Sequence, residues 1–566
     1  MRLNLGGAEV FLRAEGLEEA PGGVRLWGRE VRVFPPFPAK GFFRHGWQSW
    51  SLAAWVDPAQ APTPLLPEAR RPQADDPFLL EAGAWWGSGV GALRGPDGRA
   101  LLLGALDLGA RVLGREDLLL GRYAGEGGAW FLAHGPEEEV FAAYAQLLPR
   151  RLSGRPPRVW CSWYSFYTRI GEDLLLRVLD EVAAFSFEVF QIDDGWQRAL
   201  GDWEPNDRFP RGMAFLAERI RERGLRPGLW FAPFLVTADS PLFQMRPDWV
   251  LRDGEGRPVR AGFNWGRPLY ALDAGNEEVV EWAADLVRKA LAWGYDYLKL
   301  DFLYAAALPG AEGEARYRRA MARLREAAGE AYLLFCGAPV LASLGLADGL
   351  RVGPDVAPYW DNEERSFWLA DPTGPGLRNA LRSTLHRLWL MENVHVDPDV
   401  VYFRTRFNLL SPEEMRLQEA LAHFTGFKAT SDPPSWLLPE EKGRLEAFLA
   451  REVPVRRLGP YRFRVGEEEV DSAPLLYAPP PEEGRPGALP LRPNAPRGPP
   501  SPRRRRALPP RPPPPLPPLA GGVGGLRRPP PGAHLPPPQG ALPLVPEPGR
   551  GLPHGDPLPL LSGGRL

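Results

Sequence analysis

Residues 297–302 read Tyr-Leu-Lys-Leu-Asp-Phe, an apolar, strand-like run that ends on a carboxylate. Seven more runs of this kind lie between residues 155 and 435, and amphipathic stretches separate them. The eight runs are Val159–Ser165, Val189–Trp196, Arg226–Pro233, Tyr297–Tyr304, Ala331–Pro339, Leu350–Asp355, Leu388–Val394 and Phe427–Ser431. Eight strands alternating with helices over about 280 residues predict a (β/α)8 TIM barrel.

The intervening helices support this prediction. Residues Asn276 to Trp293 carry an apolar stripe, with Asn276 as N-cap before two glutamates, and Gly171–Phe185 and Pro412–Phe424 have similar stripes. A doubly wound open sheet is the alternative, but no Gly-rich phosphate-binding turn follows the first run. In a barrel, catalytic side chains lie at the carboxyl ends of the strands, where the notable polar residues fall here.

The chain as a whole is predicted to be multidomain. Residues 1–150 contain short β-type runs broken by Gly and Pro, which predicts a β-sandwich. The barrel domain is expected over 155–450, and 453–477 contain a β-like piece around Tyr461-Arg-Phe-Arg-Val. Within the predicted sandwich lies Gly46-Trp-Gln-Ser-Trp-Ser51, which is either a packed turn or a loop that contributes aromatic side chains to the site.

Residues 479–566 form a Pro/Gly/Arg-rich tail that holds 30 of the 67 prolines and no Phe, Tyr or Trp. This composition predicts disorder, because it offers no core to bury. From residue 485 onward, 12 Arg, no Lys and two acids give +10, which leaves −12 for residues 1–484. We favour a frameshifted GC-rich reading frame over an SH3 ligand or an RNA-binding arm. Resequencing tests this, since an alternative frame without a β-rich continuation would contradict it.

The overall composition is that of an ordinary globular enzyme, with 44% hydrophobic residues, 24% charged residues and a net charge of −2. It gives no general case for nucleic-acid binding. Cys161 and Cys336 are too far apart in sequence to suggest a disulfide framework, and we expect them to be buried in a reducing compartment. No signal peptide or membrane-spanning run is visible, so a cytoplasmic location without membrane contact is expected.

Asp301 and Asp355 are the candidate catalytic residues. Each ends an apolar run, and cleavage of a glycosidic bond needs two such carboxylates on one rim. Lys299 shares a strand face with Asp301, and Arg351 precedes Asp355 by four residues. Taken separately, Asp301 could equally form a structural ion pair, Asp355 could lie in a turn, and Asp361 is a rival for the acid role.

Further candidates end other strands. Asp193 and Asp194 follow the second run, and they are interpreted as sugar-binding groups, as exposed loop acids or, least favoured, as a divalent-metal site. Trp163 and Trp230 lie near the ends of the first and third runs, where each is either core or a platform for a sugar ring. We expect no metal and no organic cofactor.

The combination of Gln191-Ile-Asp-Asp-Gly-Trp, Lys299-Leu-Asp-Phe and Arg351-Val-Gly-Pro-Asp resembles the retaining α-galactosidases of glycoside hydrolase family 36, in the compact bacterial and thermophilic type. The likeness covers about residues 30 to 450 and starts near the Gly46–Ser51 loop. The resemblance implies a C-terminal β-domain, of which 453–477 would be a remnant.

The resemblance also implies residue roles. Asp301 would be the nucleophile and Asp355 the general acid/base. The galactose would contact Asp193, Asp194, Lys299, Arg351, Trp163 and Trp230, and either Trp47 or Trp50 would close the pocket. The expected reaction is exo-hydrolysis of terminal α-galactosides, with an oligosaccharide as the partner molecule, and Asp355 should have the higher pKa. A galactosyl transferase, an α-N-acetylgalactosaminidase or an inactive sugar-binding protein are the alternatives.

Overall fold

A computed structural model describes residues 1–60, 70–77, 84–360, 371–450, 452–459 and 461–473. All of them belong to one compact unit. The tail over 479–566 and the rival acid Asp361 lie outside the described residues, so the predictions made for them stay predictions.

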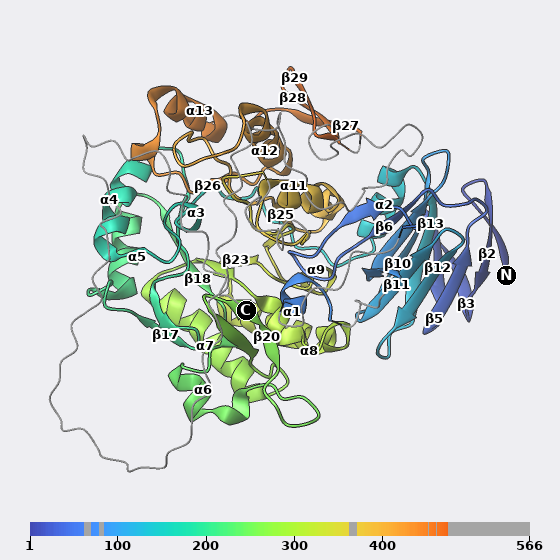
Figure 1. The fold of residues 1–566 in the computed structure, drawn as a ribbon, viewed down its shortest axis with the longest axis horizontal. Coiled ribbons are helices and arrows are strands. Elements are labelled where there is room, and N and C mark those ends of the chain that lie inside the picture. The colour runs from blue at the N-terminus through green and yellow to red at the C-terminus, as the bar shows by residue number, and fades with distance from the viewer. Residues whose placement is uncertain (61–69, 78–83, 361–370, 451, 460, 474–566) are drawn as a thin grey trace, which may run out of the picture. The chain divides into compact units, whose positions relative to one another are not determined.

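The N-terminal part is rich in antiparallel sheet, as predicted (Figure 1). Val33 and Val112 of one sheet share a buried core with Leu103 and Leu132 of the other. The first sheet has the order β1 (Arg2–Leu5), β2 (Ala8–Arg13), β5 (Glu30–Phe34), β12 (Leu118–Tyr123), β11 (Ala110–Arg115), β8 (Trp85–Ser88). The second has the order β3 (Gly16–Ala20), β4 (Gly23–Trp27), β13 (Ala129–Gly135), β10 (Ala100–Ala105), β9 (Val90–Arg94), β6 (Gly41–Arg44), β7 (Ala54–Val56).

The central part is built on eight parallel strands. Their order is β25 (His395–Asp397), β24 (Gly349–Arg351), β23 (Tyr332–Phe335), β22 (Tyr297–Leu300), β18 (Arg226–Phe231), β15 (Val189–Ile192), β14 (Val159–Cys161), β26 (Ala429–Thr430). Beyond β25, the Val401 amide donates to the Ala429 carbonyl at 2.8 Å, and the Thr430 hydroxyl donates to the Val401 carbonyl at 2.7 Å. The segment that follows β25 at one end of the strand order therefore contacts β26 at the other end.

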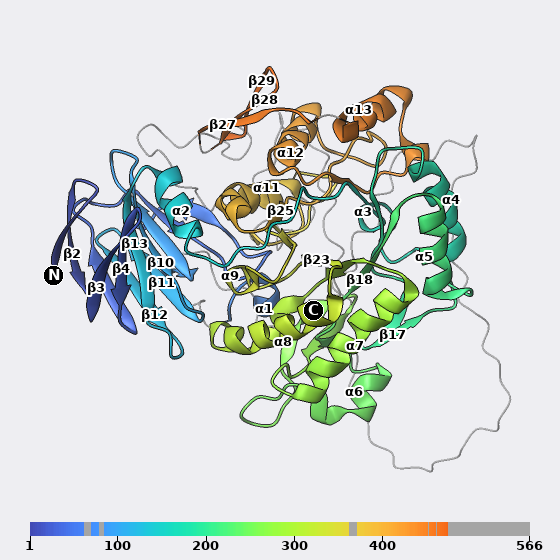
Figure 2. The ribbon, with the colours of Figure 1, turned by 180° about the vertical axis from the view of Figure 1, so that it is seen from behind.

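Helices lie outside these strands in both views (Figures 1 and 2). Asn276 caps α7 as predicted, because its side chain accepts from the Glu278 amide at 2.9 Å. Ser411 and Glu414 form a capping box at the start of α12. The helices of the central part are α3 (Trp163–Phe166), α4 (Glu172–Val182), α5 (Gly212–Glu222), α6 (Pro241–Met245), α7 (Glu277–Trp293), α8 (Glu314–Ala328), α9 (Val340–Ser343), α11 (Leu377–Leu385), α12 (Pro412–Thr425) and α13 (Pro439–Ala450).

Several smaller elements lie beside these sheets and helices. In the N-terminal part they are α1 (Arg71–Ala74) and α2 (Glu137–Ala145). Near the carboxyl ends of the parallel strands they are the hairpin β16 (Gln197–Ala199)–β17 (Asp202–Pro205), the sheet β19 (Leu235–Val236), β20 (Arg260–Asn264), β21 (Arg267–Ala271), and the 3-10 helices η1 (Pro247–Trp249), η2 (Leu303–Ala307), η3 (Ala311–Gly313) and η5 (Pro434–Trp436). The last described sheet is β27 (Val455–Gly459), β28 (Arg462–Val465), β29 (Glu468–Asp471), whose Phe463 packs on Phe424 of α12.

The prediction of a strand over Leu388–Val394 is wrong. Leu388–Glu392 form a 3-10 helix, η4, and strand β25 begins only at His395. Trp389 of this run packs on the N-terminal part instead, since its ring lies 5.6 Å from Phe141 and 5.7 Å from Tyr144 of α2. Periodicity cannot separate a short buried helix from a buried strand.

The loop Gly46–Ser51 docks on the central part. The buried Arg387 guanidinium donates to the carbonyls of Ser49 (2.7 Å), Val352 (2.8 Å), Gly46 (3.0 Å) and Gln48 (3.1 Å). The loop is therefore fixed against the end of β24, close to the segment that carries Asp355.

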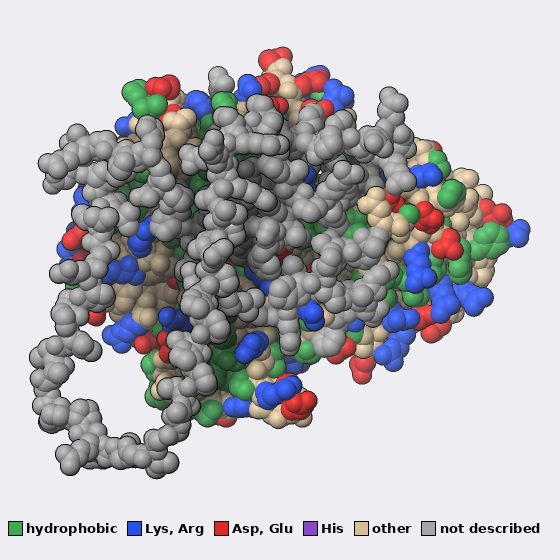
Figure 3. Space-filling view, viewed as in Figure 1, with side chains coloured by type: hydrophobic (Ala, Val, Ile, Leu, Met, Phe, Trp, Pro, Cys, Tyr) green, Lys and Arg blue, Asp and Glu red, His purple; other side chains and the backbone are tan. Residues whose placement is uncertain are grey.

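On the face of the molecule shown in Figure 3, the described residues form no patch of a single charge sign. In Figure 3, Lys, Arg, Asp and Glu side chains are interspersed over the visible described residues. Among the helices of the described residues, none is long and apolar enough to cross a membrane.

Candidate active site

Asp301 follows β22 directly and is held at both oxygens. Trp230 of β18 donates its indole N–H to Oδ2 at 3.0 Å, and the Phe302 amide donates to Oδ1 at 2.7 Å. The carboxylate is 7% exposed. Two neutral donors and burial hold this group in one orientation while an edge stays accessible, as a nucleophile requires.

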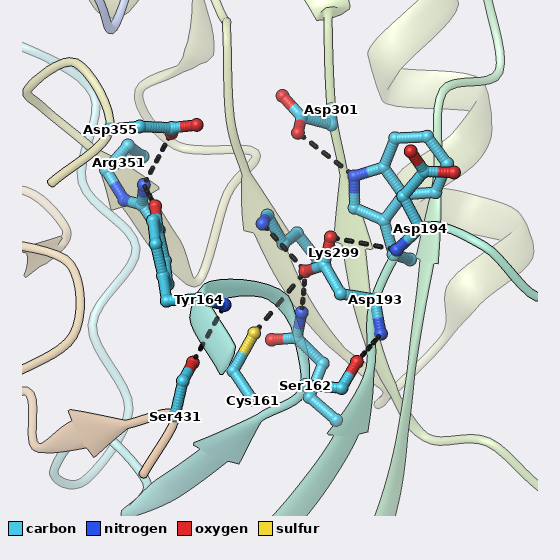
Figure 4. A network of polar contacts seen from close by, with 12 residues as sticks. Cys161, Ser162, Tyr164, Asp193, Asp194, Lys299, Asp301, Arg351, Asp355 and Ser431 are labelled. Carbon is cyan, nitrogen blue, oxygen red and sulfur yellow. Dashed lines mark hydrogen bonds and ion pairs between the residues drawn. The ribbon is translucent and has the colours of Figure 1, made fainter. Parts of the chain in front are cut away.

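Asp355 lies four residues after Arg351, the last residue of β24. Its Oδ1 accepts from Arg351 Nη1 at 3.4 Å, and its side chain is 30% exposed. In Figure 4 the carboxylates of Asp301 and Asp355 point toward the same space. Burial and the nearby Asp399 carboxylate raise the pKa of Asp355 to about 7, against the opposing effect of Arg351.

Asp193 is the centre of a buried cluster. Its Oδ2 accepts from Lys299 Nζ (2.9 Å), Gln191 Nε2 (2.6 Å) and the Cys161 thiol (3.4 Å). Its own amide donates to Ser162 Oγ at 2.9 Å. Although burial alone lowers it, the Asp193 and Asp301 carboxylates raise the pKa of Lys299 well above its ordinary value. Asp193 is thus paired with a cation, and the interpretation as an exposed loop acid does not fit.

Asp194 has a different environment. Its Oδ1 accepts from Gln197 Nε2 at 2.6 Å, whereas its Oδ2 is buried and makes no hydrogen bond of good geometry within the described residues. Burial, with a contribution from Asp193, raises the pKa of Asp194 to about 7. A buried acceptor without a donor costs free energy, and a ligand hydroxyl would remove that cost.

The two loop tryptophans differ in position. Trp47 donates its indole N–H to Glu314 of α8 at 2.9 Å, so it links the sandwich to the central part. The Trp50 ring lies 5.0 Å from that of Phe302, the neighbour of Asp301, in an edge-to-face arrangement. Its Nε1 is buried without a hydrogen-bond partner in the described part of the chain. Of the two, Trp50 is the one that packs on the residue next to Asp301.

Trp230 lies at the candidate site, whereas Trp163 lies on the helix that follows β14. Trp230 is 1% exposed and contacts Asp301 directly. Trp163 stands on the short helix α3 rather than on the strand predicted over Val159–Ser165, and its ring packs edge-on against Tyr167 at 5.2 Å. Cys161 and Cys336 are both free and buried, as expected, although Cys161 also donates to Asp193.

The sequence reasoning missed three kinds of site residue. Trp265, in the turn between β20 and β21, packs on Phe302 with rings 5.5 Å apart and opposes the rise in the pKa of Asp194. Asp397 and Asp399 bind Arg351, and Tyr164 donates to Asp399. In the sequence these acids could have been found as two carboxylates, Asp397 and Asp399, at the end of a parallel strand. They were missed because the seventh strand was predicted over Leu388–Val394, before them.

The donor set gives little support for a metal. Within the described ranges, no group of three or more His, Cys, Asp or Glu residues is arranged to hold an ion. Asp193 is bound by a lysine, a thiol and an amide, which are groups that bind a carboxylate in place of a cation.

Comparison with known proteins agrees with this geometry. Residues 145–323 match the family model described as Melibiase. The structure of TtGalA, an α-galactosidase from Thermus thermophilus in complex with p-nitrophenyl α-D-galactopyranoside, is 98% identical with a TM-score of 0.83, over 84% of this chain and 99% of that chain. The stachyose complex of TtGalA is 99% identical with a TM-score of 0.79, over 80% and 99% of the two chains.

More distant relatives share only part of their length. α-Galactosidase Mel36A of Lactobacillus acidophilus is 30% identical over 173 residues, which are 28% of this chain and 23% of that protein. The match thus spans about a quarter of this curated relative. The AgaA α-galactosidase structure from Geobacillus stearothermophilus, at 16% identity and a TM-score of 0.53, shares the fold over 78% of this chain. On the match to TtGalA, the chain belongs to the melibiase family of α-galactosidases, glycoside hydrolase family 36.

Proposed function

We propose that the chain is a retaining exo-α-galactosidase that hydrolyses terminal α-galactosides of the melibiose or raffinose type by double displacement. The observation that carries the proposal is the pair Asp301 and Asp355, which lie at the ends of two parallel strands and are directed into one space (Figure 4). The TtGalA complexes with an aryl α-galactoside and with stachyose support this substrate class.

In the proposed reaction Asp301 attacks the anomeric carbon and forms a galactosyl-enzyme. Trp230 and the Phe302 amide orient its carboxylate. Because both donors are neutral, they lower its nucleophilicity less than a bound cation would. Asp355 protonates the departing oxygen and then accepts a proton from water in the second step. With its pKa raised to about 7, Asp355 holds the proton that the first step needs at neutral pH.

The galactose ring would be recognised by groups around this pair. Within the described residues, Asp194 Oδ2 makes no hydrogen bond of good geometry, although Trp265 is close enough to lower the pKa of Asp194, and the Trp50 N–H has no acceptor, so both groups suit sugar hydroxyls. Asp193 with Lys299 and the Arg351 guanidinium would bind further hydroxyls. We assign Trp163, Trp230 and Trp265 to the pocket wall, and Trp47 to the contact between the domains.

Replacement of the carboxylates tests the proposal. Asp301→Ala should lose activity on p-nitrophenyl α-galactoside by a factor of more than about 10⁴. Asp355→Ala should also be slow, and azide should restore flux and yield α-galactosyl azide, since azide attacks the β-galactosyl-enzyme with a second inversion and needs no general base. Asp432→Asn is the control for folding, because it changes a buried carboxylate that pairs with Arg404 and is not a candidate catalytic residue. Near-native activity of Asp301→Ala would refute the assignment.

The finer features of the molecule stay proposals. We assign residues 1–150 to a sandwich domain, 155–450 to a closed (β/α)8 catalytic domain and 453–477 to a C-terminal β-region, in a cytoplasmic enzyme. Product analysis with sucrose as acceptor would reveal a transferase, and a 2-acetamido substrate would reveal an α-N-acetylgalactosaminidase. Absence of turnover on any galactoside by the full chain would leave a binding protein.

A further inference from the structure

Arg351 is surrounded by more negative charge than its contact with Asp355 accounts for. Its Nε donates to Asp397 Oδ2 at 3.0 Å, and its Nη1 lies 2.8 Å from Asp399 Oδ2. The same Nη1 reaches Asp355 Oδ1 at the longer distance of 3.4 Å. The side chains of Asp397 and Asp399 are 2% and 0% exposed, whereas that of Asp355 is 30% exposed. The guanidinium is therefore paired mainly with the two buried acids.

Asp399 also touches the backbone that carries Asp355. Its Oδ2 accepts from the amide of Val356, the next residue after Asp355, at 3.0 Å, and from the Tyr164 hydroxyl. Its Oδ1 accepts from the Val400 amide at 2.8 Å. Asp399 has a φ of 79°, in the left-handed region that Asp and Asn enter more readily than other side chains. Burial and the Asp397 carboxylate raise the pKa of Asp399, and the donors that converge on its carboxylate, Arg351 first among them, oppose that rise and favour its ionised form.

We propose that Asp399, with Asp397, is a positioning residue for the galactosidase reaction: it fixes the Asp355 backbone and neutralises Arg351 beside it. The inference rests on the proposed role of Asp355 as acid/base. Without the two buried carboxylates, Arg351 would act as an unscreened cation 3.4 Å from that group and would favour its ionised form.

The charged groups facing Asp355 come from several elements. Arg351 at the end of β24 and Lys299 of β22 favour the ionised carboxylate, whereas Asp301 after β22 and Asp399 after β25 favour the protonated one. Tyr164 of α3 lies between Asp399 and Arg351 and is neutral at working pH, since burial raises the pKa of its hydroxyl well above the ordinary value. Removal of the Asp399 charge thus shifts this balance in one direction only, toward the ionised acid/base.

Asp399→Asn tests the inference, because Asn keeps the side-chain shape and tolerates the backbone conformation. The measurement is kcat/KM on p-nitrophenyl α-galactoside against pH, whose alkaline limb reports the acid/base in the free enzyme. We expect the limb to move to lower pH by about one unit, with a lower plateau. Asp397→Asn, which removes a charge from Arg351 and leaves the Val356 contact in place, should move the limb in the same direction by less.

Asp432→Asn is the matched control. Asp432 is fully buried, pairs with Arg404 and accepts from the amides of Phe403 and Arg404, so its replacement removes a comparable buried carboxylate elsewhere. We expect this variant to lose thermal stability while its alkaline limb stays at the wild-type pH. A purely structural role for Asp399 would give the same outcome in Asp399→Asn, and an unmoved limb there would overturn the inference.

Two results keep this test separate from that of the proposed function. If Asp355→Ala is not rescued by azide, the acid/base assignment fails and takes the inference with it. If azide rescues Asp355→Ala but the limb of Asp399→Asn is unmoved, only the inference fails. Should Asp399→Asn not fold, Asp397→Asn decides, because an unmoved limb in that variant contradicts neutralisation of Arg351.

Discussion

The two tryptophans of the Gly46–Ser51 loop differ in what their indole nitrogens contact. Trp47 satisfies its N–H at Glu314, and the Trp50 N–H is buried without a partner in the described residues. We therefore expect Trp50→Phe to raise KM for p-nitrophenyl α-galactoside by about tenfold, which corresponds to one lost hydrogen bond to substrate, with little change in melting temperature.

Trp47→Phe is the matched partner of that variant. It should lower the melting temperature, because it leaves Glu314 Oε1 buried without its donor, and KM should stay near the wild-type value. The opposite pattern, with KM changed by Trp47→Phe alone, would exchange the roles of the two residues.

The individual site residues were predictable to the extent that they end apolar runs. Asp301, Asp355 and Asp193 meet that condition, Lys299 lies two residues before Asp301 on the same strand, and the four side chains lie near one another in Figure 4. Trp265 does not, because it reaches Asp194 through a hairpin turn 71 residues further along the chain. Such contacts carry no local signal in a single sequence.

Among the elements, the Arg387 segment between α11 and η4 links two parts of the site. Its guanidinium holds both the Gly46–Ser51 loop and the carbonyl after β24. Arg387→Lys keeps the charge and loses the planar fork, so at most some of the four carbonyls remain bound. We expect a loss of at least about 3 kcal/mol in the free energy of unfolding and a higher KM, measured by chemical denaturation and by steady-state kinetics.

Arg318→Lys supplies the control for this experiment. Arg318 donates to the carbonyls of Ala342 and Leu344 at 2.9 and 2.8 Å and does not belong to the loop contact. That variant should lose stability without a change in KM. Equal KM values in wild type and Arg387→Lys would show that the loop geometry does not depend on this guanidinium.

The elements themselves followed from periodicity in most cases. Six of the eight predicted apolar runs contain a strand of the parallel sheet and a seventh, Leu350–Asp355, overlaps one, and α7 and α12 begin where their capping residues indicate. The strand prediction for Leu388–Val394 fails because the Trp389 side chain packs on α2 of the N-terminal part rather than on the parallel sheet. From a single sequence, an apolar residue that packs within a sheet cannot be distinguished from one that packs against another domain.

Across the whole molecule, Glu314 joins the two large parts. Its Oε1 accepts from Trp47 and its Oε2 from the Gly109 amide at 2.8 Å, and burial raises its pKa to about 7. A carboxyl with a raised folded-state pKa binds its proton more tightly than the unfolded chain does. Its contribution to stability is therefore complete below pH 4 to 5 and is lost as pH rises toward 7, by at most about 3 kcal/mol.

Glu314→Gln should remove that contribution to the pH dependence. The measurement is the melting temperature of the variant and of wild type between pH 5 and 7.5, where we expect a shallower fall in the variant. Parallel curves would show that Glu314 titrates at its ordinary value despite its burial. Activity at a fixed pH reports separately whether the Trp47 contact survives.

The docking of the Gly46–Ser51 loop also constrains how the enzyme is made. Ser49 both donates to and accepts from Ala338, which lies 289 residues later in the sequence. The Gly46 carbonyl accepts a hydrogen bond from Arg387, which lies 341 residues later. During synthesis the loop thus leaves the ribosome long before its binding partners exist. The loop can be fixed in place only after Arg387 has been translated, so a nascent chain halted midway through the central part would hold the Gly46–Ser51 loop without the side chain that binds it.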